Sequence, residues 1–154
     1  MKGVVRAALW GTAIAGTLDI VYAIVFHGLR SGVTALRILQ SVASGLIGRA
    51  SYEGGAWTMG LGAVCHFAIA IVMAGTYAVM SLRFPVLREQ AVVCGAAYGA
   101  MLFFIMNYVV VPLSAAVPKG PPPSPAYELG LAVHIALVGI PIALAARWAL
   151  RDTD

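Results

Sequence analysis

The chain of 154 residues is too apolar for a soluble domain, because 61% of its residues are hydrophobic, 10% are charged, and its mean hydropathy is +0.91. The composition therefore predicts an integral membrane protein. The formal net charge of +4 does not indicate a nucleic-acid partner, since the ten Lys and Arg residues stand singly at the edges of apolar runs.

The first apolar run extends from about residue 5 to residue 26 and begins beside Lys2 and Arg6. At a rise of about 1.5 Å per residue, this length crosses a hydrocarbon core of about 30 Å. Small residues at helical spacing give the run one face that permits close helix contact, and this face ends in Asp19. A carboxylate inside a spanning helix is costly unless it has a partner or a function.

The segment of about residues 32–50 is predicted to be an amphipathic helix that lies in the membrane interface. One arc of its helical projection is apolar and consists of Ala35, Leu36, Leu39, Val42, Ala43, Leu46, Ile47 and Ala50. The opposite arc is polar and consists of Thr34, Arg37, Gln40, Ser41 and Ser44. The helix either fills a long connection or forms a lid over a site.

Three further spans are predicted at about residues 56–82, 91–111 and 127–150. The short connection between the second and third spans predicts that these are antiparallel neighbours. The third span contains Gly95-x-x-x-Gly99, a close-packing motif. A stiff, extended connector is expected at Pro118–Pro125, and the fourth span should bend at Pro141.

The pattern Leu-Gly-x-x-x-His-x-Ala occurs twice. Its histidine is His66 in the first copy and His134, 68 residues later, in the second. Each copy places one histidine inside a long apolar run. The repeat predicts two tandem two-helix units of the same orientation, related by a pseudo-two-fold axis along the membrane normal. The predicted fold is an all-α, four-helix transmembrane bundle in a single domain of residues 1–154, with one interfacial helix in the first loop.

The distribution of basic residues favours a cytoplasmic location for both termini. Six basic residues fall on the side of the termini, namely Lys2, Arg6, Arg83, Arg88, Arg147 and Arg151. Four fall on the other side, namely Arg30, Arg37, Arg49 and Lys119.

The chain resembles small bacterial inner-membrane proteins of the YagU-like kind. The resemblance rests on four stretches: Gly16-Thr17-Leu18-Asp19, Leu39-Gln40-Ser41-Val42-Ala43-Ser44-Gly45-Leu46, the two Leu-Gly-x-x-x-His copies, and Asn107-Tyr108-Val109-Val110-Val111-Pro112-Leu113-Ser114. It implies a location in the bacterial inner membrane and a link to envelope or acid stress. It implies no catalytic mechanism.

One polar residue per span is expected in the same half of the bilayer. Counted from the nearest end of each span, Asp19, His66, Asn107 and His134 lie roughly 9, 14, 6 and 10 Å below one surface. Tyr22 and Tyr108 can add hydroxyl groups to this set. The purely structural interpretation is that these residues only form hydrogen bonds between helices. Each such bond contributes about 0.6 kcal/mol to stability on average.

Three functions are compatible with the polar residues. The first is transport or small-ligand binding, in which Asp19, His66 and His134 relay protons or bind a cation. The second is redox chemistry, in which His66 and His134 bind haem b, or join Asp19 around a transition metal. The third is a non-catalytic scaffold or accessory subunit that forms a homo-oligomer or joins a membrane complex. The sequence contains no HExxH, nucleophile elbow or phosphate loop that would indicate an ordinary enzyme.

Overall fold

The computed structural model of the chain describes residues 1–116 and 124–151, and every secondary-structure element within these ranges is helical. Three elements are π-helical segments (η1, η3 and η4), and one is a 3-10 helix (η2). In chain order the elements are α1 (Lys2–Gly11), η1 (Thr12–Gly16), α2 (Thr17–Ser31), α3 (Ala35–Ile47), η2 (Gly48–Tyr52), α4 (Gly55–Arg83), α5 (Val86–Glu89), α6 (Ala91–Ile105), η3 (Met106–Val110), α7 (Val111–Leu113), α8 (Ser124–Val133), η4 (His134–Gly139) and α9 (Ile140–Leu150).

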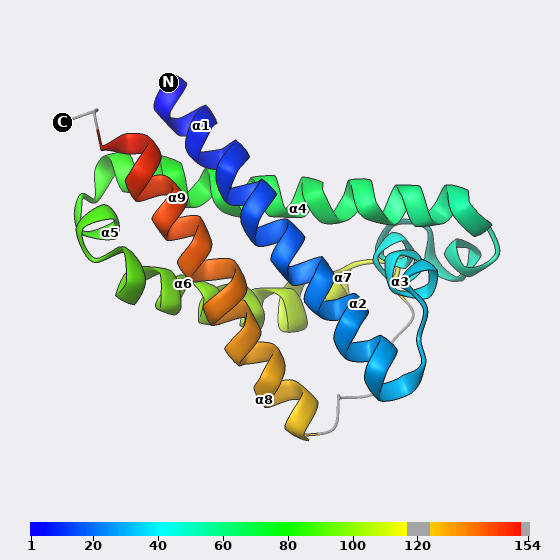
Figure 1. Cartoon of the computed structure of the whole chain (residues 1–154). Coiled ribbons are helices and arrows are strands. Elements are labelled where there is room, and N and C mark those ends of the chain that lie inside the picture. The colour runs from blue at the N-terminus through cyan, green and yellow to red at the C-terminus, as the bar shows by residue number, and fades with distance from the viewer. Residues whose placement is uncertain (117–123, 152–154) are drawn as a thin grey trace.

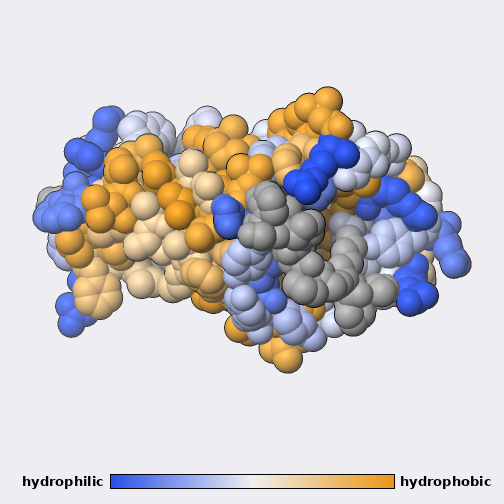
Figure 2. Space-filling model, turned by 90° about the horizontal axis from the view of Figure 1, so that it is seen from below, coloured by the Kyte–Doolittle hydropathy of each residue, from blue (hydrophilic) through white to orange (hydrophobic). Residues whose placement is uncertain are grey.

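These elements join into four helices that are long and apolar enough to cross a membrane: Lys2–Ser31, Gly55–Arg83, Ala91–Leu113 and Tyr127–Leu150. We refer to them as the first to fourth helices. They confirm the all-helical fold and the four predicted apolar spans. Both chain ends lie at one end of the bundle together with α5, and α3 lies at the other end (Figure 1). On the face that Figure 2 shows, hydrophobic surface covers much of the area, and hydrophilic residues gather towards both ends.

The fourth helix is the centre of the packing. Its last segment, α9, contacts α1, α4, α5 and α6, and η4 packs against α6. The side chains that α9 buries completely or nearly so include Ile142, Ala143, Ala146, Ala149 and Leu150. Most of these are small, so neighbouring helices approach α9 closely without large side chains between them.

The third and fourth helices meet backbone to backbone at three glycines. A Cβ atom at Gly139 would overlap the carbonyl oxygen of Gly95, and a Cβ atom at Gly99 would overlap the carbonyl oxygen of His134. The Gly95-x-x-x-Gly99 motif is therefore used for packing within the chain. Close approach of this kind is how helices associate in lipid, where no hydrophobic force pushes them together.

Two tyrosines connect the second helix to the third. The Tyr77 and Tyr98 rings pack edge to face with their centroids 5.0 Å apart. The Tyr98 hydroxyl donates to the carbonyl oxygen of Met73 at 2.8 Å, and the Tyr77 hydroxyl donates to that of Leu87, beyond the turn, at 2.9 Å. These bonds satisfy phenol groups in the interior of the bundle and hold the two antiparallel helices together.

Helix α3 packs against α4, and its buried side includes polar as well as apolar residues. Gln40 is 1% exposed, and its amide donates to Thr58 Oγ1 at 3.2 Å and to the Gly55 carbonyl at 3.3 Å. In contrast, Leu46 is 63% exposed. Ala43, which also belongs to the apolar arc, is 0% exposed, so this arc is partly buried and partly exposed.

The connector predicted at Pro118–Pro125 falls largely outside the described residues. Its last two residues, Ser124 and Pro125, belong to α8. Before the gap, the Ala115 amide donates to the Gly45 carbonyl at 2.9 Å. The end of the third helix is therefore attached to α3.

Replacement of Gly139 by alanine is expected to destabilise the protein by about 1–3 kcal/mol, because the added methyl group must push two backbones apart. Reversible unfolding in mixed micelles measures the loss. Gly60→Ala is the matched control, since nothing lies within 4 Å of a Cβ atom at Gly60. Equal stability of the two variants would contradict the close contact.

Candidate functional site

Three of the four spanning helices contain a π-helical segment: η1 in the first, η3 in the third and η4 in the fourth. The segments η3 and η4 each end two residues before a proline, Pro112 and Pro141 respectively. Proline cannot donate the hydrogen bond of a regular turn, so the backbone before it adjusts. Such wider turns inside α-helices occur frequently at functional sites.

His66 connects the second helix to the first at the end of η1. Its Nε2 atom lies 2.8 Å from the carbonyl oxygen of Gly16, the last residue of η1. Asp19 lies three residues further along the same helix, close to one turn away, and is partly buried. The partner of His66 in the first helix is thus the Gly16 carbonyl group, and Asp19 follows about one turn later in the same helix.

Asn107 and His134 both bind carbonyl groups one turn earlier in their own helices. The Asn107 amide donates to the Phe103 carbonyl at 2.8 Å, and His134 Nδ1 lies 3.0 Å from the Gly130 carbonyl. The Phe103 ring is 5.3 Å from the His134 ring and 4.8 Å from the Tyr127 ring, measured between centroids. Phe103 therefore joins these side chains into one group.

The two tyrosines of the predicted set differ in their contacts. The Tyr108 and Tyr127 hydroxyl oxygens are 2.9 Å apart, although Tyr108 is 65% exposed. Tyr22 stacks on Phe26 with a centroid distance of 5.3 Å. Tyr108 thus belongs to the group around Phe103, whereas Tyr22 packs against Phe26 in its own helix.

The carbonyl partners determine which ring nitrogens carry hydrogen. Because a carbonyl oxygen only accepts hydrogen bonds, the hydrogen is on Nε2 of His66 and on Nδ1 of His134. The other nitrogen of each ring does not take part in these bonds. The carbonyl contacts therefore use one nitrogen of each imidazole.

The two copies of the repeated motif pack differently. A Cβ atom at Gly62 would overlap the carbonyl oxygen of Leu39 in α3. A Cβ atom at Gly130 would instead lie 3.1 Å from the end of the Phe103 ring. The glycine before His66 is thus required by the approach of α3, and the glycine before His134 faces only a side chain.

The contacts place four of the six predicted site residues in two groups. His66 binds the first helix at Gly16, three residues before Asp19, whereas Asn107, Tyr108 and His134 lie around Phe103. The groups are on neighbouring elements, because η1 and α2 both pack against η4. Among the residues that the structure describes, no three His, Cys, Asp or Glu side chains form a group that could hold a metal ion. The metal site expected from Asp19, His66 and His134 stays a prediction.

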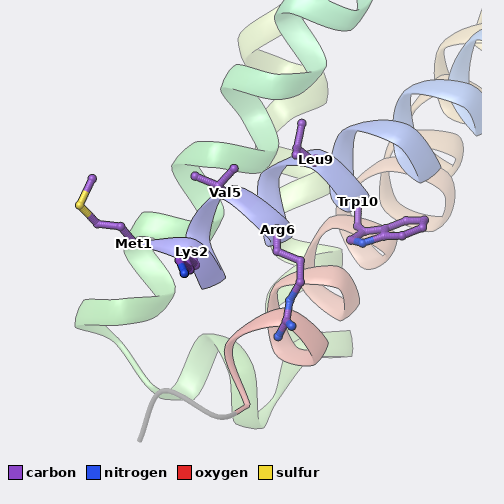
Figure 3. A pocket seen from close by; sticks show the side chains of 6 residues that line it. All are labelled: Met1, Lys2, Val5, Arg6, Leu9 and Trp10. Atoms are coloured by element: carbon purple, nitrogen blue, oxygen red, sulfur yellow. The ribbon is translucent and has the colours of Figure 1, made fainter.

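Two hollows lie at the opposite end of the bundle, near the termini. One has a volume of about 390 Å³ and follows the outer side of α1 (Figure 3), where it is lined by Met1, Lys2, Val5, Arg6, Leu9 and Trp10. Arg6 extends from it towards the end of α9 and donates to the Ala149 carbonyl at 2.7 Å. The second hollow is lined mainly by arginine.

Sequence reasoning did not identify Gly16, Phe103 and Tyr127 as partners of the polar residues. Pro112 and Pro141 were the available signals for two of the π-helical segments, since each lies shortly after a polar side chain in a span. No comparable signal marks Gly16, because its contribution is a backbone carbonyl.

Comparisons of the chain with protein-family models, with curated proteins and with solved structures find no match.

Substitution of Gly62 by alanine is expected to loosen α3, because the new methyl group displaces the Leu39 carbonyl. Amide hydrogen exchange within Ala35–Ile47 should accelerate by about tenfold, which corresponds to about 1.4 kcal/mol of local stability. Gly130→Ala is the matched variant in the other motif copy and should leave exchange in α3 unchanged. Similar exchange in both variants would show that the copies pack alike.

Proposed function

We propose that the protein relays protons across the membrane, with His66 and His134 as the groups that carry them. The observation on which this rests is that each imidazole is held on a backbone carbonyl by one nitrogen, so that the other nitrogen lies outside that bond. Histidine is the residue type whose charge ordinarily changes in the physiological pH range. Ionisable groups within spanning helices commonly mark proton pathways.

The neighbouring elements support this proposal. Asp19 lies about one turn beyond the carbonyl that His66 binds, so its carboxylate would stabilise an imidazolium there. The π-helical segments η1 and η4 pack against each other between the two groups. Irregular turns of this kind let helices shift, which a relay needs in order to pass protons from one group to the other.

Haem binding is supported less well by the geometry. A bis-histidine haem takes one ring nitrogen from each of two facing histidines. Nε2 of His66 is occupied by the Gly16 carbonyl. His134 bonds to a carbonyl of its own helix, and its ring packs edge to face against Phe103. Both rings would have to leave these positions to bind one iron from opposite sides.

A scaffold or accessory subunit is the second candidate. It is favoured by the lining of the two hollows described above, which includes none of the six predicted site residues. Self-association remains a prediction on this view. It would have to use faces other than the Gly95 and Gly99 face, because that face is covered by Gly139.

We further propose a location in the bacterial inner membrane with both termini in the cytoplasm, as the YagU-like resemblance and the basic residues imply. On this proposal, α3 lies in the interface with Leu36, Leu46 and Ile47 towards lipid, because these side chains are exposed. We also propose that the bundle consists of two tandem two-helix units, because the two Leu-Gly-x-x-x-His motifs match in sequence, although their glycines pack differently.

Replacing either histidine by glutamine should abolish proton flux while preserving the fold. Glutamine can still donate a hydrogen bond to a carbonyl, but it cannot take up a proton at neutral pH. The measurement is proton uptake into liposomes that contain the purified protein, an internal pH dye and an imposed potassium potential. We expect His66→Gln and His134→Gln each to lower the rate by at least about tenfold.

His27→Gln is the matched control, because His27 is exposed near the end of α2. Its flux should equal that of the unmodified protein. Absence of flux in the unmodified protein, or full flux in both glutamine variants, would contradict the relay and favour the scaffold.

A further inference from the structure

The second hollow is rich in positive charge. It has a volume of about 340 Å³ and is lined by Pro85, Arg88, Glu89, Arg147 and Arg151. Three guanidinium groups and one carboxylate line it, so positive charge is in excess. Its lining residues come from α5 and the end of α9, which lie at the same end of the bundle as the start of α1 (Figure 1).

The fold brings these arginines together from two elements. Arg147 and Arg151 are four residues apart on the last turn of α9 and its cap, which places them on one face. Arg88 comes from the short helix α5, which packs against α9. Its Nη1 atom donates to the Leu150 carbonyl at 3.1 Å, so the guanidinium is fixed beside the end of α9.

The aromatic residues nearby place the hollow at the level of lipid headgroups. Trp148, next to Arg147, packs edge to face against Trp10 with centroids 6.2 Å apart. Both rings are about half exposed, at 44% and 51% respectively. Arg6 lies over the Trp148 ring at 4.9 Å. Tryptophans that are partly exposed at the ends of spanning helices lie at the membrane–water interface.

We propose that this hollow binds the phosphate group of an anionic phospholipid. Guanidinium groups present paired donors that match phosphate oxygens, and the hollow opens where those phosphates lie. Basic pockets between spanning helices at an interface bind anionic headgroups in this way. Glu89 can accept a hydrogen bond from a headgroup hydroxyl, which favours phosphatidylglycerol over a headgroup with further acidic groups.

The test measures lipid retention by the full-length protein in nanodiscs of mixed phosphatidylglycerol and phosphatidylcholine, followed by native mass spectrometry. Arg147→Gln/Arg151→Gln should lower the affinity for phosphatidylglycerol by about 25-fold, at about fivefold for each arginine. Arg88 is left in place because it binds the Leu150 carbonyl. The matched control is Arg30→Gln/Arg49→Gln, which removes two exposed arginines from the other end.

A specific loss in the first pair, with phosphatidylcholine retention unchanged, supports the proposal. Equal losses in both pairs, or no preference of the unmodified protein for phosphatidylglycerol, overturn it. A separate arm adds millimolar inorganic phosphate to the lipid-free protein in detergent. Saturation by inorganic phosphate together with no lipid preference would assign the hollow to a soluble phosphate and overturn the lipid assignment.

Discussion

The contact on which the rest of the structure depends is the crossing of the third and fourth helices at Gly95, Gly99 and Gly139. Here the two backbones touch, with no side chain between them. Since lipid is as apolar as the helix surfaces, association relies on such close packing. The crossing fixes α9 in the centre, where it also receives α1 and α4. The first helix is thereby held with η1 against η4. His66 and His134 therefore lie on neighbouring parts of the bundle.

A second constraint follows from the membrane itself. Polar side chains inside a bilayer need partners, and backbone carbonyls are the most abundant acceptors there. His66, Asn107 and His134 each bind one, at or within a turn of a π-helical segment. This arrangement satisfies the side chains at low cost. It also leaves a second imidazole nitrogen on each histidine, which is the physical basis of the proposed relay.

The sequence predicts the spans well because hydropathy measures the apolar length of a helix directly. The fourth span was expected at residues 127–150 and is Tyr127–Leu150. The first helix is longer than its predicted 5–26, because it continues past its apolar part to Gly32, whose φ of 65° ends it in the left-handed conformation. Hydropathy cannot detect such polar helix ends. The sequence pattern of α3 also could not show which of its sides packs against the protein. The buried side contains the polar residue Gln40. The partners of the histidines were hidden for another reason, since any residue can supply a carbonyl.

The central claim is that His66 and His134 each donate a hydrogen bond from one ring nitrogen to a backbone carbonyl, which leaves the other nitrogen to the proposed relay. Solid-state NMR of ¹⁵N-labelled histidine in lipid bilayers tests it directly, as the ring shifts distinguish the two neutral tautomers from the imidazolium. We predict that the neutral His66 ring is the Nε2–H tautomer and the neutral His134 ring is the Nδ1–H tautomer, because each of these nitrogens lies on a carbonyl oxygen. The opposite tautomer at either ring would contradict the claim.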